Sequence, residues 1–204
     1  MVRKELALVG GRLCLDFVNT VSWRGGDEPR DNLGTYADLS RWGEHAGAWS
    51  RDEARAARRL AGRHPRKARA VLEAARALRD AVYRTVSAWK RGRAPSAADL
   101  ACVNAAAPAR SELVWRHGQI DWAPATESPR LDSVLWPIVW SAADLVVGGE
   151  RRRLKSCGSD TCGWLFYDDT RTKRRRWCSM SDCGNRAKAR RFYARASRTS
   201  ARPR

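Results

Sequence analysis

Residues 157–186 read CGSDTCGWLFYDDTRTKRRRWCSMSDCGNR, and this stretch decides the fold of the C-terminal part of the chain. It contains two C-x4-C pairs, Cys157 with Cys162 and Cys178 with Cys183, separated by fifteen residues. Each pair can form a tight turn with both sulfurs pointing inward, and the spacer is long enough for a short hairpin that brings the pairs together. Four thiolates at tetrahedral corners are what zinc prefers in structural sites. The spacing therefore predicts one structural zinc ion held by these four cysteines.

An iron–sulfur cluster also takes four thiolates, but the surrounding charge is more typical of a nucleic-acid-binding finger than of an electron carrier. Residues 151–204 carry 17 Lys or Arg against 4 Asp or Glu, a net charge of +13, whereas residues 1–150 carry 23 against 18, a net charge of +5. Such a concentration of positive charge is expected of a segment that binds a polyanion. We therefore expect zinc as the metal and a nucleic acid as the partner.

Between the two cysteine pairs, Trp164–Tyr167 has the composition of a strand. A turn at Asp169–Thr170 then predicts a second, basic strand over the residues up to Trp177, with a turn role expected for Asp168 and Asp169. A helix should follow Cys183. The aromatic residues expected to form a small core beside the metal are Trp164, Phe166, Trp177 and Phe192. The side chains expected to contact nucleic acid are Arg171, Lys173, Arg174, Arg175, Arg176, Arg186, Lys188, Arg190 and Arg191.

The rest of the chain predicts a mainly α fold: a helical domain with short β-hairpins, followed by the small four-cysteine finger with its β-hairpin and C-terminal helix. Thr35, the Ser50/Glu53 pair and the Ser96/Asp99 pair carry N-capping patterns. Helices are accordingly expected over residues 36–45, 50–61, 65–90 and 96–107, and another is expected to start at Ser128–Pro129, kink at Pro137 and end at Gly148–Gly149. Short strands are expected over residues 6–9, 12–18, 111–116 and 119–122, a linker over 151–155, and no regular structure over 197–204.

Three polar residues, Asp16, Asn19 and Thr20, stand at the end of the apolar stretch that begins the chain. They can cap or hydrogen-bond the end of that element. The alternative is a small-ligand pocket in a sensor domain.

The sequence offers no support for an enzyme or for a membrane protein. The three histidines, His45, His64 and His117, are not paired with a nucleophile, and the chain lacks a glycine-rich phosphate loop. The longest apolar stretch, residues 134–147, is too short to span a bilayer, and the N-terminal residues do not form a secretory signal. These features favour a cytoplasmic protein without catalytic activity.

Two strings of residues resemble a known bacterial family. Cys183-Gly184-Asn185-Arg186, with the four cysteines and Trp164, resembles the CGNR zinc finger, and the string GGRLCLDFVNT at residues 10–20 is similar to the start of the ABATE domain that precedes such fingers. The resemblance implies an ABATE-like domain over residues 1–149 and the finger with its basic tail over 150–204. It also implies a stress-induced transcriptional regulator, bound to DNA in the bacterial nucleoid.

The partner and the roles of several residues stay open at this stage. Double-stranded DNA is the first expectation, and structured RNA or the ribosome is the alternative. The N-terminal domain is expected to sense a ligand or to mediate dimerisation, and a homodimer is left open. Asn185 can cap the last helix, bond a zinc-bound sulfur or bind phosphate; we expect a structural role for Asn185 and phosphate binding for Arg186.

Overall fold

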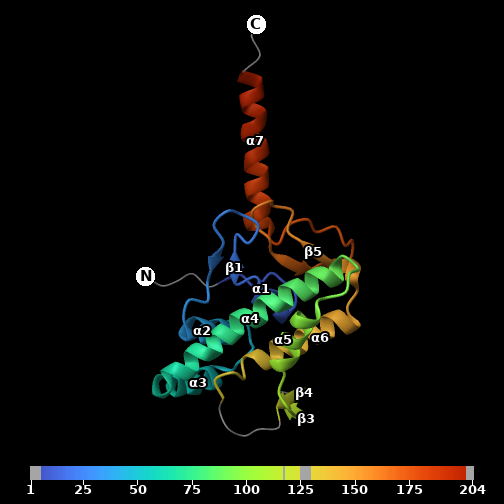
Figure 1. The fold of residues 1–204 in the computed structure, drawn as a ribbon. Coiled ribbons are helices and arrows are strands. Elements are labelled where there is room, and N and C mark those ends of the chain that lie inside the picture. Colours follow the sequence, from blue (N-terminus) through green and yellow to red (C-terminus); the bar gives the residue numbers. More distant parts are fainter. Residues whose placement is uncertain (1–5, 117, 125–129, 201–204) are drawn as a thin grey trace.

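A computed structural model describes residues 6–116, 118–124 and 130–200 of the chain (Figure 1). The fold is mainly α, as expected, with short antiparallel strand pairs. The helices are α1 (Leu13–Val18), α2 (Tyr36–His45), α3 (Arg51–Arg63), α4 (Pro65–Lys90), α5 (Ala97–Ala105), α6 (Leu135–Gly148) and α7 (Asn185–Ser200). The strand pairs are β1 (Val21–Ser22) with β2 (Arg30–Asp31), β3 (Ser111–Arg116) with β4 (Gln119–Pro124), and β5 (Leu154–Ser156) with β6 (Leu165–Tyr167).

The central element of the main core is α4. Pro65 occupies its first turn, where a missing N–H costs no helical hydrogen bond. Its buried positions include Ala68, Leu72, Ala75 and Leu78, spaced three or four residues apart, so one face of the helix is apolar. That face packs against α1, α2, α3 and α6.

The predicted caps of three helices are confirmed. Thr35 and Asp38 form a capping box at the start of α2, and Ser50 and Glu53 form one at the start of α3. The hydroxyl of Ser96 accepts the amide of Asp99 at the start of α5. The β3–β4 hairpin is also formed as predicted.

The strands predicted over residues 6–9 and 12–18 are both wrong: residues 6–9 have no regular structure, and Leu13–Val18 form α1. Cys14, Leu15, Phe17 and Val18 are all buried, so the segment shows neither the period of a half-buried strand nor that of a surface helix. Gly10 lies so close to Leu15 that a Cβ atom there would be 2.8 Å from the Leu15 Cβ, and this approach allows the chain to turn into the helix.

Helix α6 begins later than predicted, and Pro137 does not kink it. Pro137 is the third residue of the helix, where a backbone N–H has no intrahelical acceptor to lose. The helix ends at Gly148, as expected. The cap predicted at Ser128–Pro129 lies outside the described residues.

The linker predicted over residues 151–155 is wrong. The strand predicted over residues 164–167 was expected to pair with residues 171–177, and this pairing is also wrong. Arg151–Arg153 form a short 3-10 turn, and Leu154 starts β5, which pairs with β6 through Leu154–Tyr167 and Ser156–Leu165. Residues 171–177, predicted to form the second strand, have no strand structure. Leu154, Leu165 and Tyr167 belong to the main core. Burying these side chains stabilises the folded chain, whereas an exposed linker would leave them in water.

Helix α7 projects away from the rest of the molecule, and β3–β4 lies at the opposite end (Figure 1). Phe192, predicted to pack beside the metal, is instead 69% exposed on α7. The helix also continues to Ser200, although no regular structure was expected from residue 197. Among the described residues, no helix is long and apolar enough to cross a membrane.

Candidate metal centre

The first cysteine pair lies directly after β5. The amide of Cys157 donates to the carbonyl of Trp164 at 2.8 Å, and the amide of Cys162 donates to the carbonyl of Ser159 at 3.1 Å, which closes the turn between the two cysteines. Gly163 follows with a φ of +69°, and a Cβ there would be 2.8 Å from the amide nitrogen of Gly25. The turn therefore requires glycine at 163 and packs directly on the backbone of the β1–β2 loop.

The second pair lies at the start of α7. Residues Met180–Gly184 form a π-helical turn that carries Cys183 and runs directly into α7 at Asn185. A Cβ at Gly184 would be 2.7 Å from the Met180 sulfur. The turn thus fixes the direction in which α7 leaves the finger.

The four sulfurs meet in one buried cluster. Their Sγ atoms all lie within 4.8 Å of one another. The Sγ atoms of Cys162 and Cys178 are 3.8 Å apart, and those of Cys178 and Cys183 are 3.6 Å apart. Zinc–sulfur bonds of about 2.3 Å in a tetrahedron place the sulfurs about 3.8 Å from one another. The donor set and its spacing therefore fit one zinc ion with four protein ligands, which leaves no coordination position for a substrate.

The small core beside the sulfurs is formed by Phe166, which is fully buried, with Val9, Trp164 and Trp177 packed around it. Three of the four predicted aromatic residues are therefore present. The indole of Trp164 also donates to the carbonyl of Val21 at 2.8 Å. Val9 and Val21 belong to the N-terminal part of the chain, so that part completes the surroundings of the metal site.

Arg186 contacts the metal centre itself, whereas the sequence predicted a phosphate contact. Its Nη2 donates to Sγ of Cys183 at 3.0 Å, and its guanidinium lies over the ring of Trp23 at 4.2 Å. Four thiolates and one Zn²⁺ carry a net charge of −2, which a neighbouring guanidinium offsets. Asn185 donates to the carbonyl of Ser181 at 3.2 Å, which is a structural contact.

Arg175 is also engaged within the protein. Its guanidinium lies 4.3 Å from the centre of the Phe166 ring and donates to the carbonyl oxygens of Val9 and Trp177 at 2.9 and 3.0 Å. It donates to the carbonyl of Cys178 as well. Arg175 therefore joins the N-terminal segment to the second cysteine pair.

Asp168 organises the turn between the two pairs, in agreement with the turn role expected for it. Its fully buried carboxylate accepts hydrogen bonds from Lys155 Nζ at 2.7 Å, Thr170 Oγ1 at 2.6 Å and the amide of Arg175 at 2.9 Å. Burial raises the pKa of Asp168, but the hydrogen bonds from Lys155 and Thr170 outweigh burial and hold it well below its usual range.

The other predicted nucleic-acid contacts are exposed and fall into two groups. The first group lies between β6 and Cys178, where Lys173 pairs with Glu150 at 3.0 Å. The second group lies on α7, which has no acidic residue. The exposed members are Arg171, Lys173, Arg174 and Arg176 in the first group and Lys188, Arg190 and Arg191 in the second.

The three residues of the predicted ligand pocket have partners inside the protein. Asp16 Oδ1 accepts the amide of Gly10 at 2.7 Å, and burial raises the pKa of Asp16 to about 6. Asn19 exchanges two hydrogen bonds with the backbone of Leu165, at 2.8 and 3.0 Å. The Thr20 hydroxyl donates to the carbonyl of Phe17 at 2.7 Å. The Asn19 side chain thus links the β5–β6 hairpin to the N-terminal part of the chain, a role that only the tertiary structure reveals.

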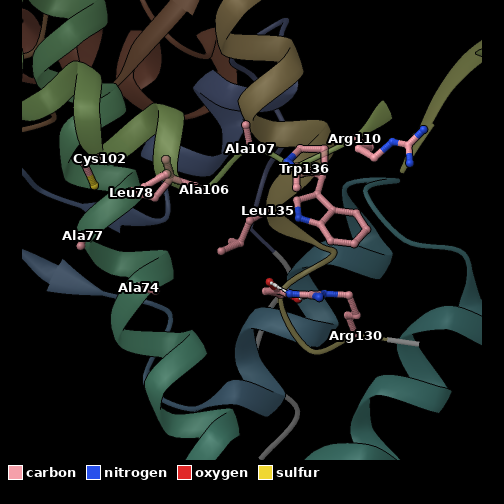
Figure 2. A pocket seen from close by; sticks show the side chains of 14 residues that line it. Ala74, Ala77, Leu78, Cys102, Ala106, Ala107, Arg110, Arg130, Leu135 and Trp136 are labelled. Atoms are coloured by element: carbon pink, nitrogen blue, oxygen red, sulfur yellow. Dashed lines mark hydrogen bonds and ion pairs between the residues drawn. The ribbon is translucent and has the colours of Figure 1, made fainter. Parts of the chain in front are cut away.

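A cavity of about 580 Å³ lies elsewhere, between α4, α5 and the start of α6 (Figure 2). Its lining includes alanines, Leu135 and Trp136, with Arg110 and Arg130 among its polar residues. The guanidinium of Arg130 is paired with Asp132 through two contacts of 2.9 Å. Asp16, Asn19 and Thr20 do not line this cavity. Three consecutive alanines at the end of α5, Ala105 to Ala107, are among the residues that line it.

Comparison with known families agrees with the resemblance seen in the sequence. The family model described as "ABATE: Putative stress-induced transcription regulator" matches residues 11–149, and the CGNR zinc finger model matches residues 153–196. Both descriptions are of regulators or zinc fingers rather than of enzymes. No curated protein matches the chain.

Proposed function

Because the chain belongs to the ABATE family and carries a CGNR zinc finger, we propose that it is a transcription regulator that binds double-stranded DNA through α7. The observation that carries this proposal is the exposure of Lys188, Arg190 and Arg191 on a helix that projects from the body of the protein (Figure 1). Sixteen residues give a helix of about 24 Å, and the major groove of DNA admits an α-helix.

The zinc centre supports this function by holding the start of the helix. Cys183 and Ala187 are buried, whereas the side chains from Lys188 to Arg195 are exposed. One end of α7 is therefore fixed to the metal site and the other presents guanidinium groups to a partner. Zinc supplies rigidity here, and the arginines supply the attraction to phosphate.

The test is fluorescence anisotropy of labelled duplex DNA with the zinc-loaded full chain, measured over a series of salt concentrations. Affinity should fall steeply as salt rises. The variant with Arg190→Ala and Arg191→Ala should lower the slope of log K against log salt by up to about 2, because each phosphate contact contributes about 0.9.

The matched control is the variant with Arg59→Ala and Arg63→Ala, which removes two exposed charges from α3. It should leave affinity and slope close to those of the unchanged protein. Equal losses for both variants would mean that net charge alone drives binding, and absence of duplex binding at low salt would refute the proposal.

Binding to RNA is the second candidate function, and the aromatic residues of α7 favour it. Phe192 and Tyr193 are 69% and 70% exposed, and their rings lie 5.7 Å apart. Exposed aromatic rings beside arginines can stack on unpaired bases. Competition between duplex DNA and structured RNA decides between the two: displacement of DNA by a small excess of RNA would make RNA the favoured partner.

A further inference from the structure

One face of the β3–β4 hairpin carries four large apolar side chains. In its register Leu113 lies opposite Trp122, and Trp115 lies opposite Ile120. Residues two apart on a strand share a face, and so do residues directly opposite on the neighbouring strand. The four side chains therefore form a single patch, which we call the hairpin face: Leu113, Trp115, Ile120 and Trp122.

The hairpin face is exposed to solvent. Leu113, Trp115 and Ile120 are 60%, 72% and 66% exposed, and Trp122 is 50% exposed. At roughly 200 Å² for a large side chain, these fractions leave on the order of 500 Å² of apolar surface. A contiguous apolar patch of this size is about as large as the largest patch on a typical monomer, and such patches are often functional.

The charge around the hairpin face suits another copy of the same chain. The whole chain carries a net charge of +18, so two copies repel each other over most of their surface. In the sequence, residues 111–124 hold two acidic residues and one arginine, a net charge of −1, so this segment does not share the strong positive charge of the rest of the chain. It also lies at the end of the molecule opposite α7 (Figure 1).

We propose that the hairpin face is the contact of a homodimer, in which the patch of one copy packs on the same patch of its partner about a two-fold axis. Two such patches bury about 1,000 Å² together, which is near the lower limit for a specific interface. The dimer is therefore expected to form in the micromolar range rather than permanently. Both α7 helices stay outside the contact, and the proposal does not depend on nucleic-acid binding.

The experiment is sedimentation equilibrium of the zinc-loaded full chain, without nucleic acid, from about 1 to about 100 μM. The unchanged protein should show a monomer–dimer equilibrium in this range. The variant with Trp115→Thr and Ile120→Thr keeps strand-forming residues in the hairpin and should weaken association by at least about 30-fold. A second variant, Trp115→Lys, places like charges across the two-fold axis and should also be monomeric.

Val147→Thr is the matched control, because Val147 is an 87% exposed apolar residue on α6, outside the hairpin. This variant should dimerise like the unchanged protein. Circular dichroism and one zinc per chain verify that each variant is folded. A monomer at all concentrations of the unchanged protein would overturn the proposal, and so would a dimer that both hairpin variants leave intact.

Discussion

Arg186 makes a different contact from the one that its residue type suggests. An arginine in a basic segment suggests a phosphate contact, but here the guanidinium lies between Sγ of Cys183 and the ring of Trp23. Groups that hydrogen-bond a metal ligand orient it and adjust its basicity. The contact with Trp23 also joins the metal centre to the loop after β1.

Replacing Arg186 should therefore weaken zinc binding. We expect Arg186→Ala to lower zinc affinity by about 10- to 100-fold. Arg186→Lys should restore only part of it, because an ammonium group cannot bond the sulfur and lie flat on the indole at once. Competition with a chromophoric chelator measures the affinity.

Arg190→Ala is the control for this experiment, since Arg190 is exposed on the same helix and should leave zinc affinity unchanged. Unchanged zinc affinity in Arg186→Ala, together with lost DNA binding, would instead support the phosphate contact expected from the sequence.

The raised pKa of Asp16 predicts a pH dependence of stability. Burial favours the neutral carboxyl in the folded chain and raises its pKa to about 6, above the unfolded value. The contribution of this group to the free energy of unfolding is therefore complete below the unfolded pKa and is lost as pH rises to about 6. Asp16→Asn should become more stable relative to the unchanged protein as pH rises.

Urea unfolding of both proteins from about pH 5 to about pH 8 measures this effect. Effects of pH on the zinc site are common to both proteins and cancel in the difference between them. The difference should grow up to about pH 6.5 and then remain constant. A constant difference over the whole range would contradict the raised pKa.

At the scale of the elements, the aromatic residues of the finger fall into two classes: those packed beside the cysteines and those exposed on α7. Phe166 is fully buried against the cysteines, whereas Phe192 lies on the exposed part of α7. Phe166→Ala should cost about 3–5 kcal/mol of unfolding free energy. Phe192→Ala should change it by no more than about 0.5 kcal/mol.

Chemical unfolding of the zinc-loaded protein, followed by circular dichroism, measures both variants. Tyr193→Ala, at the neighbouring exposed position, serves as a further control and should behave like Phe192→Ala. A loss of several kcal/mol in Phe192→Ala would mean that α7 packs on the finger in solution.

Elements defined by neighbouring residues could be predicted from the sequence, and elements defined by distant partners could not. Thr35, Ser50 and Ser96 cap helices through residues three positions away, so the pattern is local. Four of the six residues of α1 are buried and the other two are partly buried, so the helix has no exposed polar face that would reveal it in the sequence. Strand β5 pairs with residues 9 to 13 positions away, and nothing in its own three residues distinguishes it from a linker.

The metal site likewise has a part that the sequence predicted and a part that it could not predict. The spacing of the four cysteines predicted the sulfur cluster, because ligand spacing is a property of the sequence. The contacts of Arg175 with Val9 and of Arg186 with Trp23 join residues more than 150 positions apart, so no spacing rule could reveal them.

At the scale of the whole molecule, the finger and the helical part share one core. Leu154 and Leu165 of the β5–β6 hairpin belong to the main core, and Asn19 hydrogen-bonds the backbone of Leu165. The second cysteine pair and α7 lie outside this core. The two regions should therefore respond differently to loss of the metal.

Removal of zinc should unfold only part of the finger. We expect the cysteine turns and α7 to lose their amide protection, because zinc supplies on the order of 10–16 kcal/mol to small sites of this kind. The β5–β6 hairpin and α4 should keep theirs, because both contribute buried residues to the main core. Hydrogen exchange with mass spectrometry, with and without a chelator, measures both regions.

Cys178→Ser serves as a second route to the same state, since it removes one zinc ligand without a chelator. It should give the same exchange pattern. Loss of protection in α4, or full protection of α7, would contradict this division of the molecule.

The contact of Gly163 with Gly25 limits which N-terminal domains can be joined to this finger. Each glycine meets the backbone of the other loop, so any side chain at either position would separate them. A chimera that grafts this finger onto a foreign N-terminal body would fail unless the β1–β2 loop were transplanted with it. Protein engineers should treat that loop as belonging to the finger, although more than a hundred residues separate the two along the chain.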